Sequence, residues 1–218
     1  MQSRSSLFLI LFLLAFVAIA VQLQALTIAF DKIGLSKESA FLLLLISLVG
    51  AGINLPLFTI KSEAPPAAPR PLSPWWNQYP KIEFTGKTLV AVNAGGCVIP
   101  VAFSIYLIWY KSLNPLEIII VVASVTLISR LTSRSIPGLG IGMPMFVAPI
   151  SAALTSTLTN AEQSAPLAYI AGTMGVLIGA DILRLGSIRK LGTPLASIGG
   201  GGTFDGIFLS GLVAVLLA

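Results

Sequence analysis

Two aspartates, Asp181 and Asp205, are the residues of this chain whose setting best favours chemistry. Asp181 lies within the apolar stretch 175–183, and Asp205 follows a run of four glycines and opens another apolar stretch. Two carboxyl groups in one poorly solvated site share a proton, because both cannot comfortably ionise together. One then serves as a base and the other as an acid, which is sufficient to activate a water molecule against a peptide carbonyl.

The rest of the composition removes other kinds of catalysis. The chain has no histidine and a single cysteine, Cys97. This excludes Ser–His and Cys–His catalytic pairs, an internal disulfide framework and a cysteine-based zinc site. The six remaining acidic residues lie in loops or at the ends of apolar runs. We therefore predict Asp181 and Asp205 as the catalytic pair, with no metal and no cofactor.

The elements that must position these residues are those of a membrane protein. Of the 218 residues 56% are hydrophobic and 10% are charged, and the mean hydropathy is +0.94. An average soluble domain carries about a quarter charged residues, so this chain cannot cover a water-facing surface. The net charge of +5 lies at the ends of apolar runs, which is typical of membrane orientation and not of nucleic-acid binding. We expect one all-α membrane domain with the lipid bilayer as its partner and no nucleic acid.

The apolar runs predict about seven transmembrane helices. They cover residues 7–30, 40–60, 88–110, 115–129, 141–159, 166–183 and 203–218. Glycines and prolines over 136–145 interrupt regular helix, so we expect a broken Pro/Gly-rich segment before the fifth span. A linker with six prolines, 61–87, separates spans two and three in the cytoplasm or at the membrane interface.

The positive charges predict the orientation of these spans. With seven spans, ten of the thirteen Lys and Arg residues fall on the side of the N-terminus and three on the other. Positive residues concentrate on the cytoplasmic side, which puts the N-terminus inside and the C-terminus outside the cell membrane. Asp181, at the end of span six, and Asp205, at the start of span seven, then lie at nearly the same depth.

Glycines surround this predicted pair. Because they lack side chains, Gly199, Gly200, Gly201, Gly202 and Gly206 would let a substrate strand or helix approach closely. We predict them as substrate-binding residues. A flexible loop combined with close helix packing is the alternative reading of the same glycines.

This arrangement resembles the core of the intramembrane aspartyl proteases, the presenilin, signal-peptide-peptidase and prepilin-peptidase group. In that group one Asp lies on one helix and a second lies in a Gly-x-Gly-Asp motif on the next. Asp181 matches the first, and Gly201, Gly202 and Asp205 loosely match the second, with two residues between Gly202 and Asp205. The resemblance covers about residues 175–211 and implies hydrolysis of membrane-embedded peptide substrates. The whole chain is also similar to small multi-pass membrane proteins of archaea and bacteria.

Two other functions fit the same residues. A proton-coupled transporter or permease would use both carboxylates, with a polar cavity passing Asn54 or Asn93. A non-catalytic membrane scaffold would pair each aspartate with a nearby arginine, Arg184 or Arg189, and would need no cavity. The protease reading requires that both carboxyl groups face one cavity.

Overall fold

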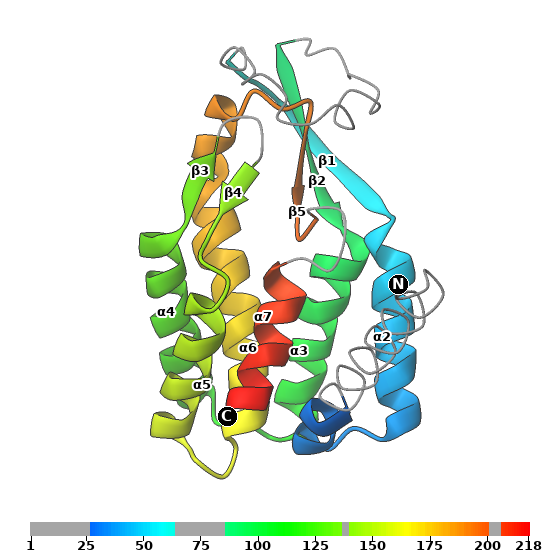
Figure 1. The fold of residues 1–218 in the computed structure, drawn as a ribbon, viewed down its shortest axis with the longest axis vertical. Helices are drawn as coiled ribbons and strands as arrows, with labels where there is room; N and C mark the ends of the chain where they lie inside the picture. The colour runs from blue at the N-terminus through cyan, green and yellow to red at the C-terminus, as the bar shows by residue number, and fades with distance from the viewer. Residues whose placement is uncertain (1–26, 64–85, 137–139, 201–205) are drawn as a thin grey trace, which may run out of the picture.

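The computed structural model describes residues 27–63, 86–136, 140–200 and 206–218. Within these ranges the helices run side by side in alternating directions, and short strands gather at one end of the bundle (Figure 1). We call this the strand end. The C-terminus lies at the opposite end, which also holds the start of α2 and the loop before α4.

Helices make up most of the described chain. A short helix, Thr27–Ile33, precedes the others, which are α2 (Lys37–Ala51), α3 (Ile99–Tyr110), α4 (Pro115–Thr132), α5 (Val147–Thr159), α6 (Ser164–Val176) and α7 (Gly206–Leu217). Three segments have other helical geometries: the π-helices η2 (Ala94–Val98) and η3 (Leu177–Asp181), and the 3₁₀-helix η4 (Ile182–Lys190).

Helix starts follow the residues that favour them. The Ser36 side chain accepts a hydrogen bond from the Ser39 amide at the start of α2, and the Asn114 side chain accepts one from the Leu116 amide at the start of α4. Such side-chain oxygens satisfy amides that have no partner within the helix. Pro115 follows as the first residue of α4, where its missing N–H costs nothing.

The strands correct the prediction of an all-α chain. They are β1 (Asn54–Lys61), β2 (Lys87–Asn93), β3 (Arg134–Ile136), β4 (Gly140–Gly142) and β5 (Leu195–Ile198). One sheet has the order β1-β2-β5, with β1 and β2 antiparallel and β2 and β5 parallel, and β3 pairs with β4. Strands thus form the last third of the predicted span 40–60 and the start of the predicted span 88–110.

Local chemistry explains why these two apolar runs are not continuous helices. Pro56 has no N–H and disrupts a helix interior, but it is tolerated in an edge strand such as β1. The Asn93 side chain accepts a hydrogen bond from the Gly96 amide and so begins the helical turn of η2 where β2 ends. The predicted linker 61–87 begins at the last residue of β1 and ends at the first residue of β2, and residues 64–85 of it lie outside the described ranges.

Fewer helices are long enough to cross a membrane than the apolar runs predict. Pro115–Thr132 and Ser164–Lys190 are long and apolar enough to cross a membrane, and a third span results if Thr27–Ile33 and Lys37–Ala51, bent by 114°, act together. The α5 helix has 13 residues, or about 20 Å at 1.5 Å per residue, against a hydrocarbon core of about 30 Å. The described residues therefore contain two to three candidate spans. The predicted first span, 7–30, lies largely outside the described ranges.

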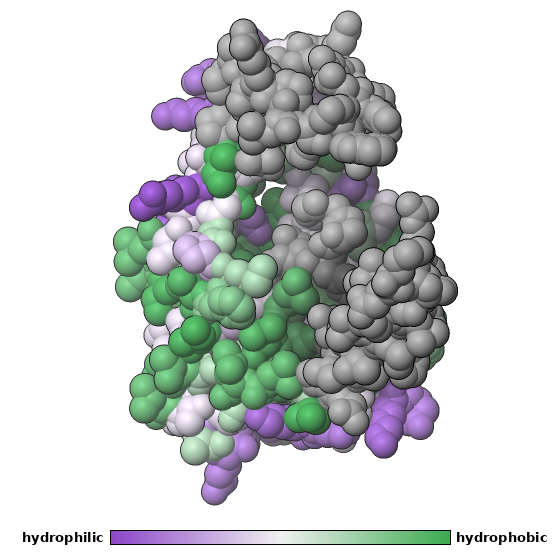
Figure 2. Space-filling model, viewed as in Figure 1, coloured by the Kyte–Doolittle hydropathy of each residue, from purple (hydrophilic) through white to green (hydrophobic). Residues whose placement is uncertain are grey.

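Charge is distributed unequally between the two ends of the bundle. The strand end carries seven described basic residues, namely Lys61, Lys87, Arg130, Arg134, Arg184, Arg189 and Lys190. The opposite end carries three, Lys32, Lys37 and Lys111, together with four acidic residues. Between the ends, Figure 2 shows a broad apolar surface over α4 and α5, with hydrophilic residues above and below it. This distribution is typical of a protein that lies in a bilayer.

The α6 helix is the centre of the bundle, in contact with α3, α4, α5 and α7. Glycines allow the closest of these contacts. A Cβ on Gly175 would lie 2.6 Å from the Val125 Cβ of α4, and a Cβ on Gly172 would lie 3.0 Å from the Gly211 Cα of α7. Spans with small residues at their contacts pack backbone against backbone. In the 18-residue apolar window of the segment that contains α6, 72% of the residues are buried, against 17% in α4, so α6 is internal and α4 is peripheral.

Candidate functional site

Asp181 lies where the central helix loses its regular form. It is the last residue of the π-helix η3, directly before the 3₁₀-helix η4, and its side chain is half-buried. Turns of π-helix are rare and occur frequently at functional sites, because they re-aim side chains at the expense of regular hydrogen bonding. The sequence prediction that Asp181 ends the sixth span at a loop is replaced by a continuous but irregular helix that extends to Lys190.

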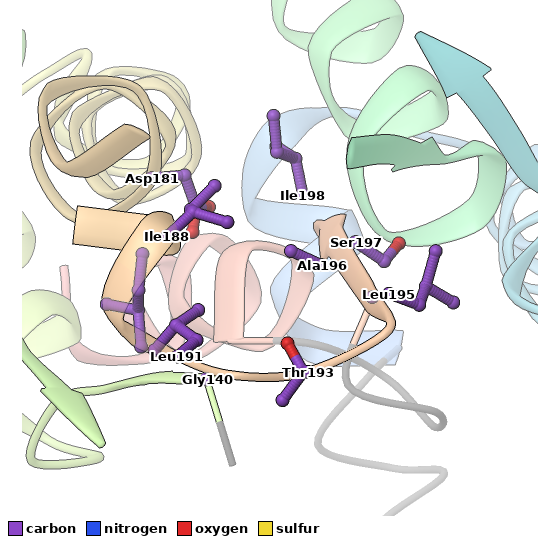
Figure 3. A pocket seen from close by; sticks show the side chains of 11 residues that line it. Gly140, Asp181, Ile188, Leu191, Thr193, Leu195, Ala196, Ser197 and Ile198 are labelled. Atoms are coloured by element: carbon purple, nitrogen blue, oxygen red, sulfur yellow. The ribbon is translucent and has the colours of Figure 1, made fainter. Parts of the chain in front are cut away.

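An inner cavity of about 160 Å³ adjoins Asp181. Its walls come from four parts of the chain: Asp181 itself, the end of η4 and the turn after it, strand β5 with Gly200, and the β4 residues Gly140 and Ile141. Figure 3 shows Asp181 on one side of this cavity and β5 on the other. Asp181 and an extended strand therefore lie on opposite sides of one small cavity.

Strand β5 is an edge strand among the described strands. It pairs with β2 on one side, from Leu89 opposite Leu195 to Val92 opposite Ile198. All four of its residues line the inner cavity. An edge strand presents backbone N–H and C=O groups to which another extended segment can pair.

A side cavity of about 530 Å³ lies next to the inner one. It is bordered by β4 and the start of α5 on one side and by η3 and α7 on the other, and Ile141 and Asp181 line both cavities. Met145 and Phe146, at its border, are 75% and 60% exposed. The side cavity therefore connects the apolar outer surface of the bundle with the position of Asp181.

The predicted partner, Asp205, lies outside the described residues, as do Gly201 and Gly202. Their predicted roles stay predictions. The chain on either side of them is described: Gly200 lines the inner cavity, and Ile207 of α7 lines the side cavity. Segment 201–205 thus connects two residues that border the same pair of cavities as Asp181.

The described glycines before this segment pack tightly against their own chain. Gly199 has φ +70°, and a Cβ there would lie 2.5 Å from the Cβ of Cys97 and 2.8 Å from its amide nitrogen. A Cβ on Gly200 would lie 3.0 Å from the Asn93 Cβ, although Gly200 also lines the inner cavity. Gly199 thus has a packing role within the chain. Gly206 is the first residue of α7.

Asn54 and Asn93, which the transporter hypothesis places along a polar cavity, form side-chain hydrogen bonds at the junction of the strands and helices. Asn93 Nδ2 donates hydrogen bonds to the Ala51 carbonyl at 2.8 Å and to Asn54 Oδ1 at 3.1 Å, while its Oδ1 accepts from the Gly96 amide at 2.8 Å. Ser197 of β5 also donates to Asn54 Oδ1. Neither asparagine lines the inner or the side cavity. Their amides therefore join β1 to the end of α2 and to η2.

Arg184, which the scaffold reading pairs with Asp181, is directed to α4. Its Nε donates to Ser133 Oγ at 2.7 Å and its Nη2 donates to the Arg130 carbonyl at 2.8 Å. The cavities beside Asp181 are a second departure from that reading, which requires none. Among the described residues, no group of three or more His, Cys, Asp or Glu side chains could hold a metal ion.

Several cavity residues were missed at the level of sequence, above all β5. A signal for it exists, because Leu195–Ile198 is a short run with two apolar aliphatic ends between Pro194 and Gly199, and such flanking residues are typical of strand boundaries. The spacing of Gly175 and Gly179, four residues apart, likewise indicates a helix-packing face.

Comparison with known proteins gives a family and no activity. No curated protein and no solved structure matches the chain significantly. A family described as "Protein of unknown function (DUF1614)" matches residues 48–217. This range includes every described strand and all residues that line the inner and side cavities. Because this match covers well over half of the chain, the protein belongs to the DUF1614 family.

Proposed function

We propose that this protein is an intramembrane aspartyl protease in which Asp181 and Asp205 form the catalytic pair. One observation carries the proposal: both described flanks of segment 201–205 border the cavities that Asp181 borders. Asp205 is two residues from Ile207, so their Cα atoms are at most about 7.6 Å apart. This short covalent link to a residue of the side cavity supports Asp205 as the second carboxyl group of the pair.

The chemistry needs only these two groups and water. The ionised carboxylate takes a proton from water while its oxygen attacks the carbonyl carbon of the scissile peptide, and the protonated carboxyl donates its proton to the carbonyl oxygen. The first carboxyl group then passes its new proton to the amide nitrogen while the second takes a proton back from a hydroxyl of the resulting diol, and the C–N bond breaks to yield a carboxyl group and an amine. The pair ends with one shared proton, as it began.

The two cavities suit a membrane-embedded peptide as the substrate. The side cavity offers an apolar route from the outer surface between α5 and α7 to Asp181. The free edge of β5 can pair with an extended backbone, which holds a peptide open for attack on its carbonyl. A helical transmembrane segment that unwinds locally at this point would present one peptide bond between β5 and the carboxyl groups.

The test is a cleavage assay with the full-length chain in lipid vesicles and a transmembrane peptide that carries a fluorophore and a quencher. Asp181→Asn and Asp205→Asn should each abolish cleavage, because each removes one ionisable carboxyl group. Glu63→Gln, an exposed acidic residue at the same end, should cleave at the wild-type rate. Thermal unfolding of each variant in detergent separates loss of chemistry from loss of fold.

Two results would overturn the proposal. One is cleavage that survives in both aspartate variants. The other is uptake of protons into vesicles that requires Asp181 and Asp205 while no peptide is cut, since this outcome describes a proton-coupled transporter.

A further inference from the structure

A third cavity, separate from the two beside Asp181, lies on the outer side of the bundle. This outer groove has a volume of about 510 Å³ and is formed by one residue of α3, seven residues of α4 and four residues of α6 and its continuation. Its lining is aliphatic except for Thr126 and one charged residue, Arg130, in the last turn of α4. The groove is therefore apolar along its length and positively charged at one end.

The size of the groove fits a single hydrocarbon chain. From Ile118 to Arg130 the α4 helix rises about 18 Å at 1.5 Å per residue. One leaflet of a bilayer core is about 15 Å thick, which is close to this length. A helix is 10–12 Å wide with its side chains, so an 18 Å stretch of helix would fill about 1,400 Å³. The groove holds about a third of that volume, which favours an occupant thinner than a helix.

The charged end of the groove is suited to an anion. Arg184 Nη2 donates to the backbone carbonyl of Arg130 at 2.8 Å, and the two side chains are near enough for the charge of Arg130 to act on Arg184. The hydrogen bonds of the Arg184 guanidinium go to a hydroxyl group and a backbone carbonyl, neither of which carries a negative charge. Guanidinium groups bind phosphate oxygens through paired N–H donors, and basic pockets between membrane helices bind anionic headgroups.

We propose that the outer groove binds one anionic phospholipid, with an acyl chain along α4 and α6 and the phosphate against Arg130 and Arg184. The charge distribution of the whole molecule supports the same occupant. Five further Lys and Arg residues lie at the strand end, where Glu63 and Asp181 are the acidic residues of the described ranges. A lipid in this position would cover exposed side chains such as Ile119 and Leu127, which are 63% and 61% exposed.

The charge requirement is tested by titrating the purified full-length protein in detergent with phosphatidylglycerol or phosphatidylcholine of identical acyl chains and counting bound lipids by native mass spectrometry. We expect one phosphatidylglycerol to bind at least about tenfold more tightly than phosphatidylcholine, a difference of roughly 1.4 kcal/mol. Arg130→Gln should remove this preference. Arg134→Gln, an exposed arginine on β3 outside the groove, is the matched control and should retain it.

The apolar requirement is tested with two exposed leucines of α4. Leu127 lines the groove and Leu131, one turn further on, does not, and they are 61% and 72% exposed. Leu127→Trp should fill the groove and weaken binding of both lipids, whereas Leu131→Trp should not. Glycerol phosphate, which has the headgroup charge and no tail, should fail to compete.

Three outcomes overturn the proposal: equal binding of the two lipids, equal effects of Arg130→Gln and Arg134→Gln, or competition by glycerol phosphate. Each would mean that general surface charge, and not the groove, attracts the lipid. Thermal unfolding of every variant shows that the fold is retained, which is expected because all four side chains are at least partly exposed.

Discussion

Arg184 donates a hydrogen bond of 2.7 Å from its Nε to the Oγ of Ser133, the residue that caps the C-terminal end of α4. Its Nη2 reaches the Arg130 carbonyl in the same last turn. The last carbonyls of a helix have no partner within it, and basic side chains near them are favourable. Because Arg184 follows Asp181 by three residues, these bonds attach the segment that presents Asp181 to the end of the neighbouring helix.

Replacement of Arg184 by methionine should therefore destabilise the bundle. Methionine retains much of the packing volume and loses both hydrogen bonds, and the free energy of unfolding should fall by about 2 kcal/mol. Thermal or denaturant unfolding in detergent measures this change. Arg189→Met, at an exposed position of the same 3₁₀-helix, should change it by less than about 0.5 kcal/mol. Equal effects of the two substitutions would contradict the bridging role.

Contact between α4 and η3, the continuation of α6, should depend on Gly179. A Cβ there would overlap the Thr126 carbonyl and lie 2.9 Å from the Ser129 Cβ, so Gly179→Ala should lower the free energy of unfolding by about 1–3 kcal/mol. Gly186→Ala is the control, because nothing lies within 4 Å of its Cβ position. Titration with a denaturing detergent separates the two. A Gly179→Ala variant as stable as Gly186→Ala would show that the helices are less closely packed.

The close packing of Gly199 in the glycine-rich turn can be tested against Gly86, a control glycine with a similar backbone conformation. Their φ angles are +70° and +76°, so alanine at either position carries the strain of a left-handed backbone, about 1 kcal/mol. Alanine at 199 would in addition meet Cys97, whereas nothing lies within 4 Å at 86. We expect Gly199→Ala to lower the melting temperature clearly more than Gly86→Ala. Similar melting temperatures would mean that the turn adapts.

The Asn93 side chain should contribute more to the free energy of unfolding than an ordinary helix cap does. Its side chain, 2% exposed, makes three hydrogen bonds, and Asn93→Ala should lower the free energy of unfolding by about 3 kcal/mol, roughly 1 kcal/mol for each bond. Asn114→Ala removes one bond at the exposed start of α4 and should cost about 1 kcal/mol. Equal losses in denaturant unfolding would argue against the network between the strands and η2.

The side cavity predicts a kinetic effect that rests on the proposed protease activity. Val213 of α7 lines this cavity, and Val213→Phe should occupy part of it and raise KM for a transmembrane peptide by roughly tenfold, or about 1.4 kcal/mol of binding. Leu217→Phe, one turn further along α7 and 55% exposed, should leave KM unchanged. Peptide cleavage with an unaltered KM in Val213→Phe would exclude the side cavity as the route to Asp181.

The amino-acid sequence by itself determined the properties that depend on composition and on local breaks. Apolar runs with charges at their ends specify a membrane-type surface, and the Pro- and Gly-rich stretch after α4 specifies an interruption before α5, where β3 and β4 are found. The position of Asp181 within an apolar stretch also indicated a functional residue, because an ionisable side chain there is energetically costly and such residues are usually functional. These features need no knowledge of distant residues.

Only the tertiary structure decided which apolar segments become strands and what Asp181 faces. Residues 87–93 form an apolar run that fits a helix as well as a strand, and the choice depends on pairing partners. For β2 one of these partners is β5, more than 100 residues away. The cavity beside Asp181 exists because β5 is brought opposite η3, and Gly199 is required because Cys97 lies against it. Such contacts join residues far apart in the chain, so no local pattern of residues could have specified them.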